Sequence, residues 1–219
     1  MLGTSIVFDF DGVLIDSRFA VSHCMNRALA ANGLPERPAE ELYRYIGPPT
    51  STAFADLLGD SPDAPRVADV IRSYRECYGR TALANTRVFD GIPEALERLA
   101  AEHRLAVATS KPLPFAEELL RGLGLRDRFA TVAGPAFDAA DDKTATLAAA
   151  LAALGPTRAV MIGDTTFDMV AAVAHGMPGI GVAWGIGAAA DLEAAGASRI
   201  VARPDELDGA VADALASVG

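Results

Sequence analysis

The sequence predicts an α/β fold with a mostly parallel sheet, interrupted near its N-terminus by an all-helical insert. Two observations predict the sheet: short apolar runs rich in β-branched residues recur along the chain, and longer stretches with helical periodicity separate them. A third observation predicts the insert, because no convincing strand-like run falls between residues 16 and 86. We therefore expect an α/β core of residues 1–15 and 87–219 and a helical insert of residues 16–86.

The strands of the core are expected where the apolar runs occur, and helices are expected between them. In chain order these runs are Ser5–Phe8, Leu105–Ala108, Thr131–Ala133, Ala159–Ile162, Gly179–Ala183 and Arg199–Val201. Three of the intervening helical patterns are followed by a glycine, Gly122, Gly155 or Gly176, which is a typical stop signal for a helix. Alternation of this kind favours parallel strands covered by helices.

The insert carries helical stripes of apolar residues. One stripe comprises Val21, Cys24, Met25, Ala28 and Leu29, and a second comprises Val67, Val70, Ile71, Tyr74 and Tyr78. Six prolines interrupt this part of the chain, so we expect short helices joined by tight turns. Gly12 and Gly91 lie near the two crossings between core and insert and are candidate hinges.

Composition excludes several classes of partner. The 219 residues carry a formal net charge of −10 at pH 7, which disfavours binding to nucleic acid or to an anionic membrane surface. No signal-like segment is evident, and the apolar stretch Thr144–Leu154 is too short to span a bilayer. Two cysteines, Cys24 and Cys77, are too few for a disulfide framework, so we expect thiols of a cytoplasmic protein, with Cys24 buried.

Reactive side chains follow three of the predicted strands. Asp9 and Asp11 follow the first strand, Thr109-Ser110-Lys111 follow the second, and Asp164 and Asp168 follow the fourth. Ligands of open α/β sheets bind at the carboxyl ends of strands, so these residues are the candidate site. Asp9 and Asp11 are two residues apart, which on an extended segment directs both carboxylates to the same side.

Four carboxylates in one place repel each other unless a cation or a shared proton intervenes. A hard divalent cation with oxygen ligands resolves the conflict, and Mg²⁺ is the natural choice because it needs only one or two carboxylates besides water and substrate phosphate. The sequence therefore predicts a magnesium site formed by Asp9, Asp11, Asp164 and Asp168.

Lys111 and Lys143 are the two lysines of the chain, in which the other 17 basic residues are arginine. Lys143 lies near the start of a predicted helix, where its charge opposes the helix dipole. A compact ammonium that pairs with a carboxylate and a phosphoryl oxygen explains this placement. Pro112 favours a fixed loop at Lys111, although a chance surface lysine also fits that position.

The segments Asp9–Ser17, Val107–Pro112, Lys143 and Gly163–Asp168 resemble, in order, the four motifs of the haloacid dehalogenase superfamily. The resemblance covers nearly the whole chain. It is nearest to the phosphoglycolate phosphatase-like branch, which includes nucleotide phosphatases. It implies a Rossmann-like core, a mobile helical cap over the site, and Mg²⁺-dependent phosphoryl transfer.

Two further segments resemble loops of the same branch. They are Tyr45-Ile46-Gly47-Pro48-Pro49 and Gly181-Val182-Ala183-Trp184-Gly185. Trp184 itself is interpreted as capping the core, with lining of the site entrance as the alternative.

The resemblance also implies a role for each core residue. Asp9 attacks phosphorus and becomes an aspartyl phosphate, and Asp11 acts first as general acid and then as general base. Thr109 donates a hydrogen bond to a phosphoryl oxygen, and Lys143 neutralises developing charge while holding Asp9.

The implied metal ligands are the Asp9 carboxylate, the Asp11 backbone carbonyl and Asp164, with Asp168 binding through water or orienting the other ligands. The phosphate-binding set adds Gly12, Ser110 and Lys111, through backbone amides and the lysine charge.

We therefore expect a Mg²⁺-dependent phosphatase of small phosphomonoesters, of the phosphoglycolate or nucleotide type, that is a monomer or homodimer. Asp11 argues against a dehalogenase, and the lack of lysine in residues 16–86 argues against a phosphonatase. A sugar phosphomutase stays open, in which Arg44 and Arg75 would grip a second phosphate, although solvated arginines are the simpler interpretation. A non-catalytic phosphate-binding module is the third alternative.

Overall fold

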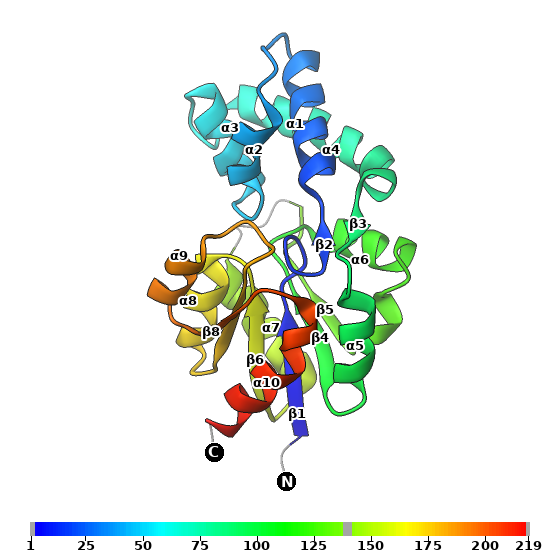
Figure 1. Cartoon of the computed structure of the whole chain (residues 1–219). Helices are drawn as coiled ribbons and strands as arrows, with labels where there is room; N and C mark the ends of the chain where they lie inside the picture. The colour runs from blue at the N-terminus through cyan, green and yellow to red at the C-terminus, as the bar shows by residue number, and fades with distance from the viewer. Residues whose placement is uncertain (1–2, 138–141, 218–219) are drawn as a thin grey trace. The chain divides into compact units, whose positions relative to one another are not determined.

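The computed structural model describes residues 3–137 and 142–217; residues 1–2, 138–141 and 218–219, which include both ends of the predicted core, lie outside the described part. The chain divides into two compact units. The first comprises Met1–Asp16 and Val88–Gly219, and the second comprises Ser17–Arg87. The second unit is therefore an insertion within the first, as the chain colouring in Figure 1 shows.

The described residues of the first unit form a six-stranded sheet in which every neighbouring pair is parallel. The order of strands across the sheet is β5-β4-β1-β6-β7-β8. The strands are β1 (Gly3–Phe8), β4 (Arg104–Ala108), β5 (Thr131–Ala133), β6 (Thr157–Gly163), β7 (Gly179–Val182) and β8 (Ala197–Val201). Each lies on a predicted apolar run, so the α/β class and the parallel sheet are confirmed.

The strand order places the carboxyl ends of β1, β4 and β6 side by side. Phe8, the last residue of β1, is in register with Val107 of β4 and with Ile162 of β6. From β1 the chain proceeds to β4 and β5 on one side, and then returns to β6, β7 and β8 on the other. The direction therefore reverses between β1 and β6, which is where open α/β sheets bind their ligands.

Helices cover both faces of this sheet (Figure 1). Helices α7 and α8 pack against each other and the sheet, and α5 and α10 do the same on the opposite face. The helices of this unit are α5 (Ile92–Ala100), α6 (Leu113–Gly122), α7 (Lys143–Leu154), α8 (Thr166–Ala174), α9 (Ala189–Ala194) and α10 (Leu207–Ala216), with short 3₁₀ turns η2 (Arg126–Arg128) and η3 (Pro204–Glu206).

The core between the sheet and α7 and α8 is formed by fully buried apolar side chains. Val7, Ala106 and Met161 of three adjacent strands cluster with Leu147 of α7 and Ala171 of α8. Full burial of a large apolar side chain is worth about 1.5–3 kcal/mol, so this layer holds the strand ends in place.

One predicted helix stop differs in detail. Helix α6 ends at Gly122, but the residue with left-handed backbone is Gly124, with φ 72°. The Leu125 amide then donates to the Leu120 carbonyl at 2.8 Å, so the turn closes two residues later than expected. Gly155 and Gly176 do have positive φ where α7 and α8 end.

Two strands of two residues each, β2 (Ile15–Asp16) and β3 (Arg87–Val88), form a second small sheet. The sequence gives no strand signal there, because two residues are too few to show an alternating pattern.

The second unit is helical, which confirms the predicted insertion. It consists of α1 (Arg18–Ala31), α2 (Ala39–Leu42), the 3₁₀ turn η1 (Tyr43–Tyr45), α3 (Thr50–Leu58) and α4 (Pro65–Asn85). Helices α1 and α4 pack along each other, and the five stripe residues of α1 are all buried. Among the described residues, no helix combines the length and the apolar character needed to cross a membrane.

A disulfide between Cys24 and Cys77 joins α1 to α4, so the expectation of free thiols is wrong. Both cysteines lie on the buried faces of their helices, and packing of these faces brings the Cα atoms to 5.4 Å, within the range that a disulfide spans. The sequence separation of 53 residues hides this pairing, because only the tertiary contact between α1 and α4 creates it.

Candidate active site

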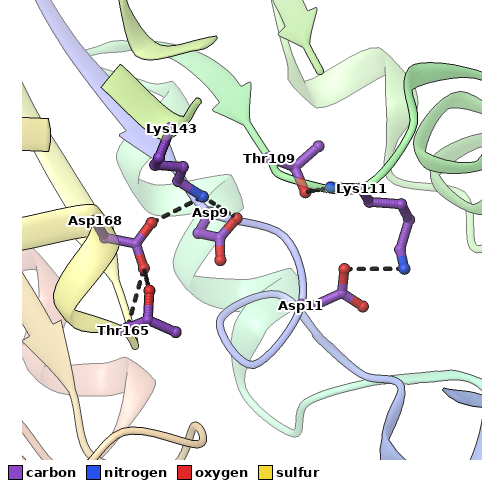
Figure 2. Close-up of polar contacts among 7 residues, drawn as sticks. All are labelled: Asp9, Asp11, Thr109, Lys111, Lys143, Thr165 and Asp168. Carbon is purple, nitrogen blue, oxygen red and sulfur yellow. Dashed lines mark hydrogen bonds and ion pairs between the residues drawn. The ribbon is translucent and has the colours of Figure 1, made fainter. Parts of the chain in front are cut away.

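Asp9 follows the central strand, near two lysines and three further aspartates, Asp11, Asp164 and Asp168; Figure 2 shows all of these except Asp164. Its backbone N–H donates to the Ile162 carbonyl at 2.8 Å, which extends the sheet by one residue. Lys143, the first residue of α7, places its Nζ atom 2.6 Å from Asp9 Oδ1 and 2.8 Å from Asp168 Oδ1. All three side chains are at least nine-tenths buried.

Local helix capping explains how Lys143 can occupy the first turn of α7. Asp142 precedes the helix, and its carboxylate accepts hydrogen bonds from the backbone N–H groups of Thr144 and Ala145. A carboxylate at this position satisfies free amides and offsets the unfavourable effect of a lysine near the positive end of the helix dipole.

Asp168 has a structural and an electrostatic contact. Its Oδ2 atom accepts from the Thr165 N–H at 3.0 Å and from the Thr165 hydroxyl at 2.7 Å, which forms a capping box at the start of α8. A side chain at Gly163 would place its Cβ atom 2.2 Å from Asp168 Cβ, so glycine is required there. The capping box fixes Asp168 with its other oxygen toward Lys143 (Figure 2).

Asp164 follows β6 and is completely buried. Its Oδ2 atom accepts the Ile186 backbone N–H at 2.8 Å, whereas no hydrogen-bond partner for Oδ1 occurs among the described residues. Oxygen atoms of Asp9, Asp164 and Asp168 all lie within 4.8 Å of one another. These three residues form the carboxylate cluster.

Burial and mutual repulsion perturb the ionisation of this cluster. Burial raises the pKa of Asp9 to about 7; Lys143 opposes this effect and Asp168 adds to it. Burial, together with the charges of Asp9 and Asp168, raises the pKa of Asp164 well above its ordinary value. Burial alone lowers the pKa of Lys143, but the Asp168 and Asp9 carboxylates outweigh it, so the lysine stays charged.

The carboxylate cluster fits a hard divalent cation. It offers only oxygen donors, and Asp164 Oδ1 is a buried acceptor with no hydrogen-bond partner among the described residues, which costs free energy. When all three carboxylates are ionised, the single positive charge of Lys143 leaves two negative charges for a bound cation to neutralise. The Asp11 carboxylate does not belong to this cluster.

Asp11 instead pairs with Lys111. Lys111 Nζ lies 3.0 Å from Asp11 Oδ2, and both side chains are largely buried, so Lys111 is not a solvated surface lysine. The expected common direction of Asp9 and Asp11 assumes an extended segment, but the chain bends at Phe10, and the two carboxylates contact different lysines (Figure 2).

Thr109 and Lys111 share the loop that follows β4. The Lys111 backbone N–H donates to Thr109 Oγ1 at 3.0 Å, and Thr109 is almost completely buried. Ser110 lies between them and is half-buried. The loop approaches Gly134 so closely that a Cβ atom there would lie 2.8 Å from the Lys111 carbonyl oxygen.

Gly12 contributes space to the site. Its φ of 79° is a backbone conformation that glycine adopts without strain, and a Cβ atom would lie 2.0 Å from Asp164 Oδ2. Its backbone N–H donates to the Ile15 carbonyl at 2.9 Å and is therefore already used within the loop.

The two candidate arginines lie in the second unit. Arg44 Nη2 donates to the Tyr45 hydroxyl and lies 3.1 Å from Asp56 Oδ2, in the wall of an open cavity of about 290 Å³. Arg75 is a half-buried residue of α4. Their role in gripping a second phosphate stays a prediction.

Sequence reasoning missed the groups that orient the aspartates. The Thr165-x-x-Asp168 spacing is a capping-box pattern and was available as a signal. No sequence signal identifies the Ile186 backbone amide, because any residue except proline supplies an N–H group.

A family model of haloacid dehalogenase-like hydrolases matches residues 6–182 of the chain. The chain is 36% identical to a 5′-nucleotidase of Pseudomonas aeruginosa over 87% of both chains. It is 32% identical to a phosphoglycolate phosphatase of Cereibacter sphaeroides, over 78% of this chain and 81% of the relative. It is also 38% identical to the tyrosine-protein kinase PtkA of Mycobacterium tuberculosis over 84% of its length, but it spans only 63% of that protein.

A solved structure shows the same architecture. The crystal structure of a predicted phosphatase from Clostridium acetobutylicum superposes with a TM-score of 0.89 and 28% sequence identity, over 97% of this chain and 99% of that one.

Fold, family match and carboxylate cluster together define the class: the chain belongs to the haloacid dehalogenase-like hydrolases. Within that family it is similar to phosphoglycolate phosphatases and to a 5′-nucleotidase.

Proposed function

We propose that this protein is a Mg²⁺-dependent phosphatase that hydrolyses small phosphomonoesters, of the phosphoglycolate or nucleotide type, through an aspartyl-phosphate intermediate. The observation that carries the proposal is the buried arrangement of Asp9, Lys143, Asp164 and Asp168 at the carboxyl ends of β1 and β6. Relatives with the corresponding names support the two substrate types.

In the proposed reaction, Asp9 is the nucleophile. Lys143 holds Oδ1 of Asp9 at 2.6 Å, which leaves Oδ2 to attack phosphorus in line as the ester P–O bond breaks. Asp11 donates a proton to the departing alkoxide. It then takes a proton from the water that attacks the phosphorus of the aspartyl phosphate, and Asp9 is released as a carboxylate.

Positively charged and hydrogen-bonding side chains hold the phosphoryl group. Thr109 donates its hydroxyl to one phosphoryl oxygen, and Lys143 neutralises charge that develops on another. Ser110 and Lys111 extend this binding site from the loop after β4, where Lys111 also keeps Asp11 in position.

The residues that would hold Mg²⁺ are Asp9, Asp164 and the Asp11 backbone carbonyl, with Asp168 as a further ligand or as an orienting group. When bound, Mg²⁺ neutralises the carboxylates and the phosphate charge, so that Asp9 is ionised at neutral pH.

A phosphate-release assay with an aryl phosphate, with Mg²⁺ or with excess EDTA, tests the proposal. We expect turnover that depends on Mg²⁺ and saturates with substrate. Absence of turnover across pH 5–9 in Mg²⁺ contradicts the enzyme proposal and favours a phosphate-binding module.

A substrate panel then distinguishes the alternatives. We expect free phosphate from phosphoglycolate or from 5′-nucleotides. Conversion of a hexose 1-phosphate to its 6-phosphate without free phosphate identifies a phosphomutase instead.

The cytoplasmic location and the monomer or homodimer state stay predictions that this substrate panel does not test.

A further inference from the structure

The loop that joins β7 to α9, residues 183–188, is built around Asp164. The Ile186 N–H donates to Asp164 Oδ2 at 2.8 Å, and the Gly187 N–H donates to the Asp164 backbone carbonyl at 3.0 Å. The loop therefore binds the side chain and the backbone of the same aspartate.

Two glycines allow this approach. A Cβ atom at Gly185 would lie 2.2 Å from Asp164 Cβ, and one at Gly187 would lie 2.3 Å from the Asp164 carbonyl oxygen. Neither neighbouring atom belongs to the far end of a flexible side chain, so a larger residue would have to displace Asp164 or the loop. The loop can therefore approach Asp164 this closely only because both glycines lack a Cβ atom.

Trp184 connects this loop to the segment that follows Asp11. Its indole Nε1–H donates to the Val13 carbonyl at 3.1 Å. Val13 is adjacent to Gly12. Gly12 also lies close to Asp164, because a Cβ atom at Gly12 would overlap with Asp164 Oδ2. Asp164 therefore lies between two loops, and the Trp184 hydrogen bond holds those loops together.

The arrangement fixes which oxygen of Asp164 can bind a ligand. Oδ2 is engaged by the Ile186 amide, whereas Oδ1 has no partner among the described residues, and Asp164 contributes one of its two oxygens to the carboxylate cluster. Rotation of the carboxylate would break the Ile186 hydrogen bond, so the loop holds Oδ1 in a single direction.

We propose that the 183–188 loop positions Asp164 for the metal ion, and that the Trp184–Val13 hydrogen bond, by holding this loop in place, raises the affinity of the site for Mg²⁺. The inference rests on the proposed function, because it requires that the carboxylate cluster binds Mg²⁺. Trp184 is then a positioning residue that acts through Asp164 and does not touch the substrate.

Two variants test the proposal. Trp184→Phe keeps an aromatic ring and removes the N–H donor, and Gly185→Ala forces Asp164 to move. We expect a Mg²⁺ dissociation constant that rises roughly five-fold in Trp184→Phe, as for loss of one neutral hydrogen bond, and by 10- to 100-fold in Gly185→Ala, as for other contacts that orient metal ligands. Isothermal titration calorimetry of the unreacted protein with MgCl₂ measures both.

A positioning role also separates metal binding from chemistry. In Trp184→Phe we expect the Mg²⁺ concentration for half-maximal activity to rise with the dissociation constant, while kcat at saturating Mg²⁺ stays within about two-fold of wild type. The matched control is Gly209→Ala in α10, where an added Cβ meets nothing within 4 Å, and its Mg²⁺ affinity should equal that of the wild type.

The outcomes separate the two proposals. If the wild type binds Mg²⁺ and Trp184→Phe and Gly185→Ala bind it equally well, the positioning role is overturned and the metal site stands. If the wild type binds no Mg²⁺, the metal site fails and the positioning role fails with it. Melting temperatures within a few degrees of wild type establish that the variants are folded. If Trp184→Phe is not folded, Gly185→Ala still tests whether the loop positions Asp164, and unchanged Mg²⁺ affinity in that variant overturns the proposal.

Discussion

Each of the two units places a basic side chain against a carboxylate, but the pair is buried in the first unit and exposed in the second. In the first unit Lys143 lies 2.6 Å from Asp9, and the side chains are 6% and 8% exposed. In the second unit Arg44 lies 3.1 Å from Asp56, and the side chains are 69% and 60% exposed. The distances are similar, and the surroundings are not.

The difference shows that burial, and not the ion pair itself, creates a chemically useful site. At an effective dielectric constant near 20 the attraction between two charges is about four times that in water. Burial also raises the pKa of Asp9 to about 7, and Asp164 Oδ1 has no hydrogen-bond partner in the described part of the chain. The Arg44–Asp56 pair is exposed to solvent, where the attraction between the two charges is weak.

The largest effect is expected for Asp9→Asn. This change removes the nucleophile and keeps the volume of the side chain, so turnover of an aryl phosphate should fall by about 10³-fold or more. The fold should survive, as circular dichroism can establish. Turnover within ten-fold of wild type would overturn the assignment of Asp9.

The next effect is expected for Lys143→Met, measured as stability. Removal of one partner from a buried ion pair leaves uncompensated charge, and we expect a loss of about 3 kcal/mol in the free energy of unfolding in EDTA, part of which proton uptake by the carboxylates can recover. Urea denaturation measures this loss. A loss below about 1 kcal/mol would show that Lys143 does not compensate the cluster.

Removal of the disulfide tests the stability of the second unit. A cross-link that closes a loop of this length is worth about 2–4 kcal/mol, so the double variant Cys24→Ala/Cys77→Ala should melt at a lower temperature than the oxidised wild type. Dithiothreitol should lower the melting temperature of the wild type and leave that of the variant unchanged. Equal responses of both proteins would show that the disulfide does not form.

The raised pKa of Asp9 in the buried site can be tested by measuring melting temperatures as a function of pH. Between about pH 4 and pH 7 the folded protein keeps a proton on Asp9 that the unfolded chain has lost, so its stability falls as pH rises through this interval. In EDTA, Asp9→Asn should therefore melt above the wild type at pH 8, and the difference should vanish near pH 4. A constant difference across this range would contradict the raised pKa.

The smallest effect is expected for Arg44→Met, which is the counterpart of Lys143→Met. Because the Arg44–Asp56 pair is exposed, its loss should leave the urea midpoint almost unchanged. A drop equal to that of Lys143→Met would show that exposure does not distinguish the two regions.

Much of the fold could be predicted from the sequence because strand and helix signals are local. Apolar runs of three to five residues and helical stripes are written in neighbouring positions, so the six strands and the helical insertion were identified from them. The left-handed glycine after α6 is Gly124 and not Gly122, and the sequence does not separate them because both glycines carry the same local signal.

The sequence by itself determined which residue types lie at the carboxyl ends of β1, β4 and β6, and therefore the candidates Asp9, Thr109 and Asp164. Only the tertiary structure decided their partners. Lys143 meets Asp9 across 134 positions and the Ile186 amide meets Asp164 across 22, and the disulfide between α1 and α4 spans 53. Periodicity describes neighbours within one element, whereas these contacts arise from how separate elements pack, which no local pattern encodes.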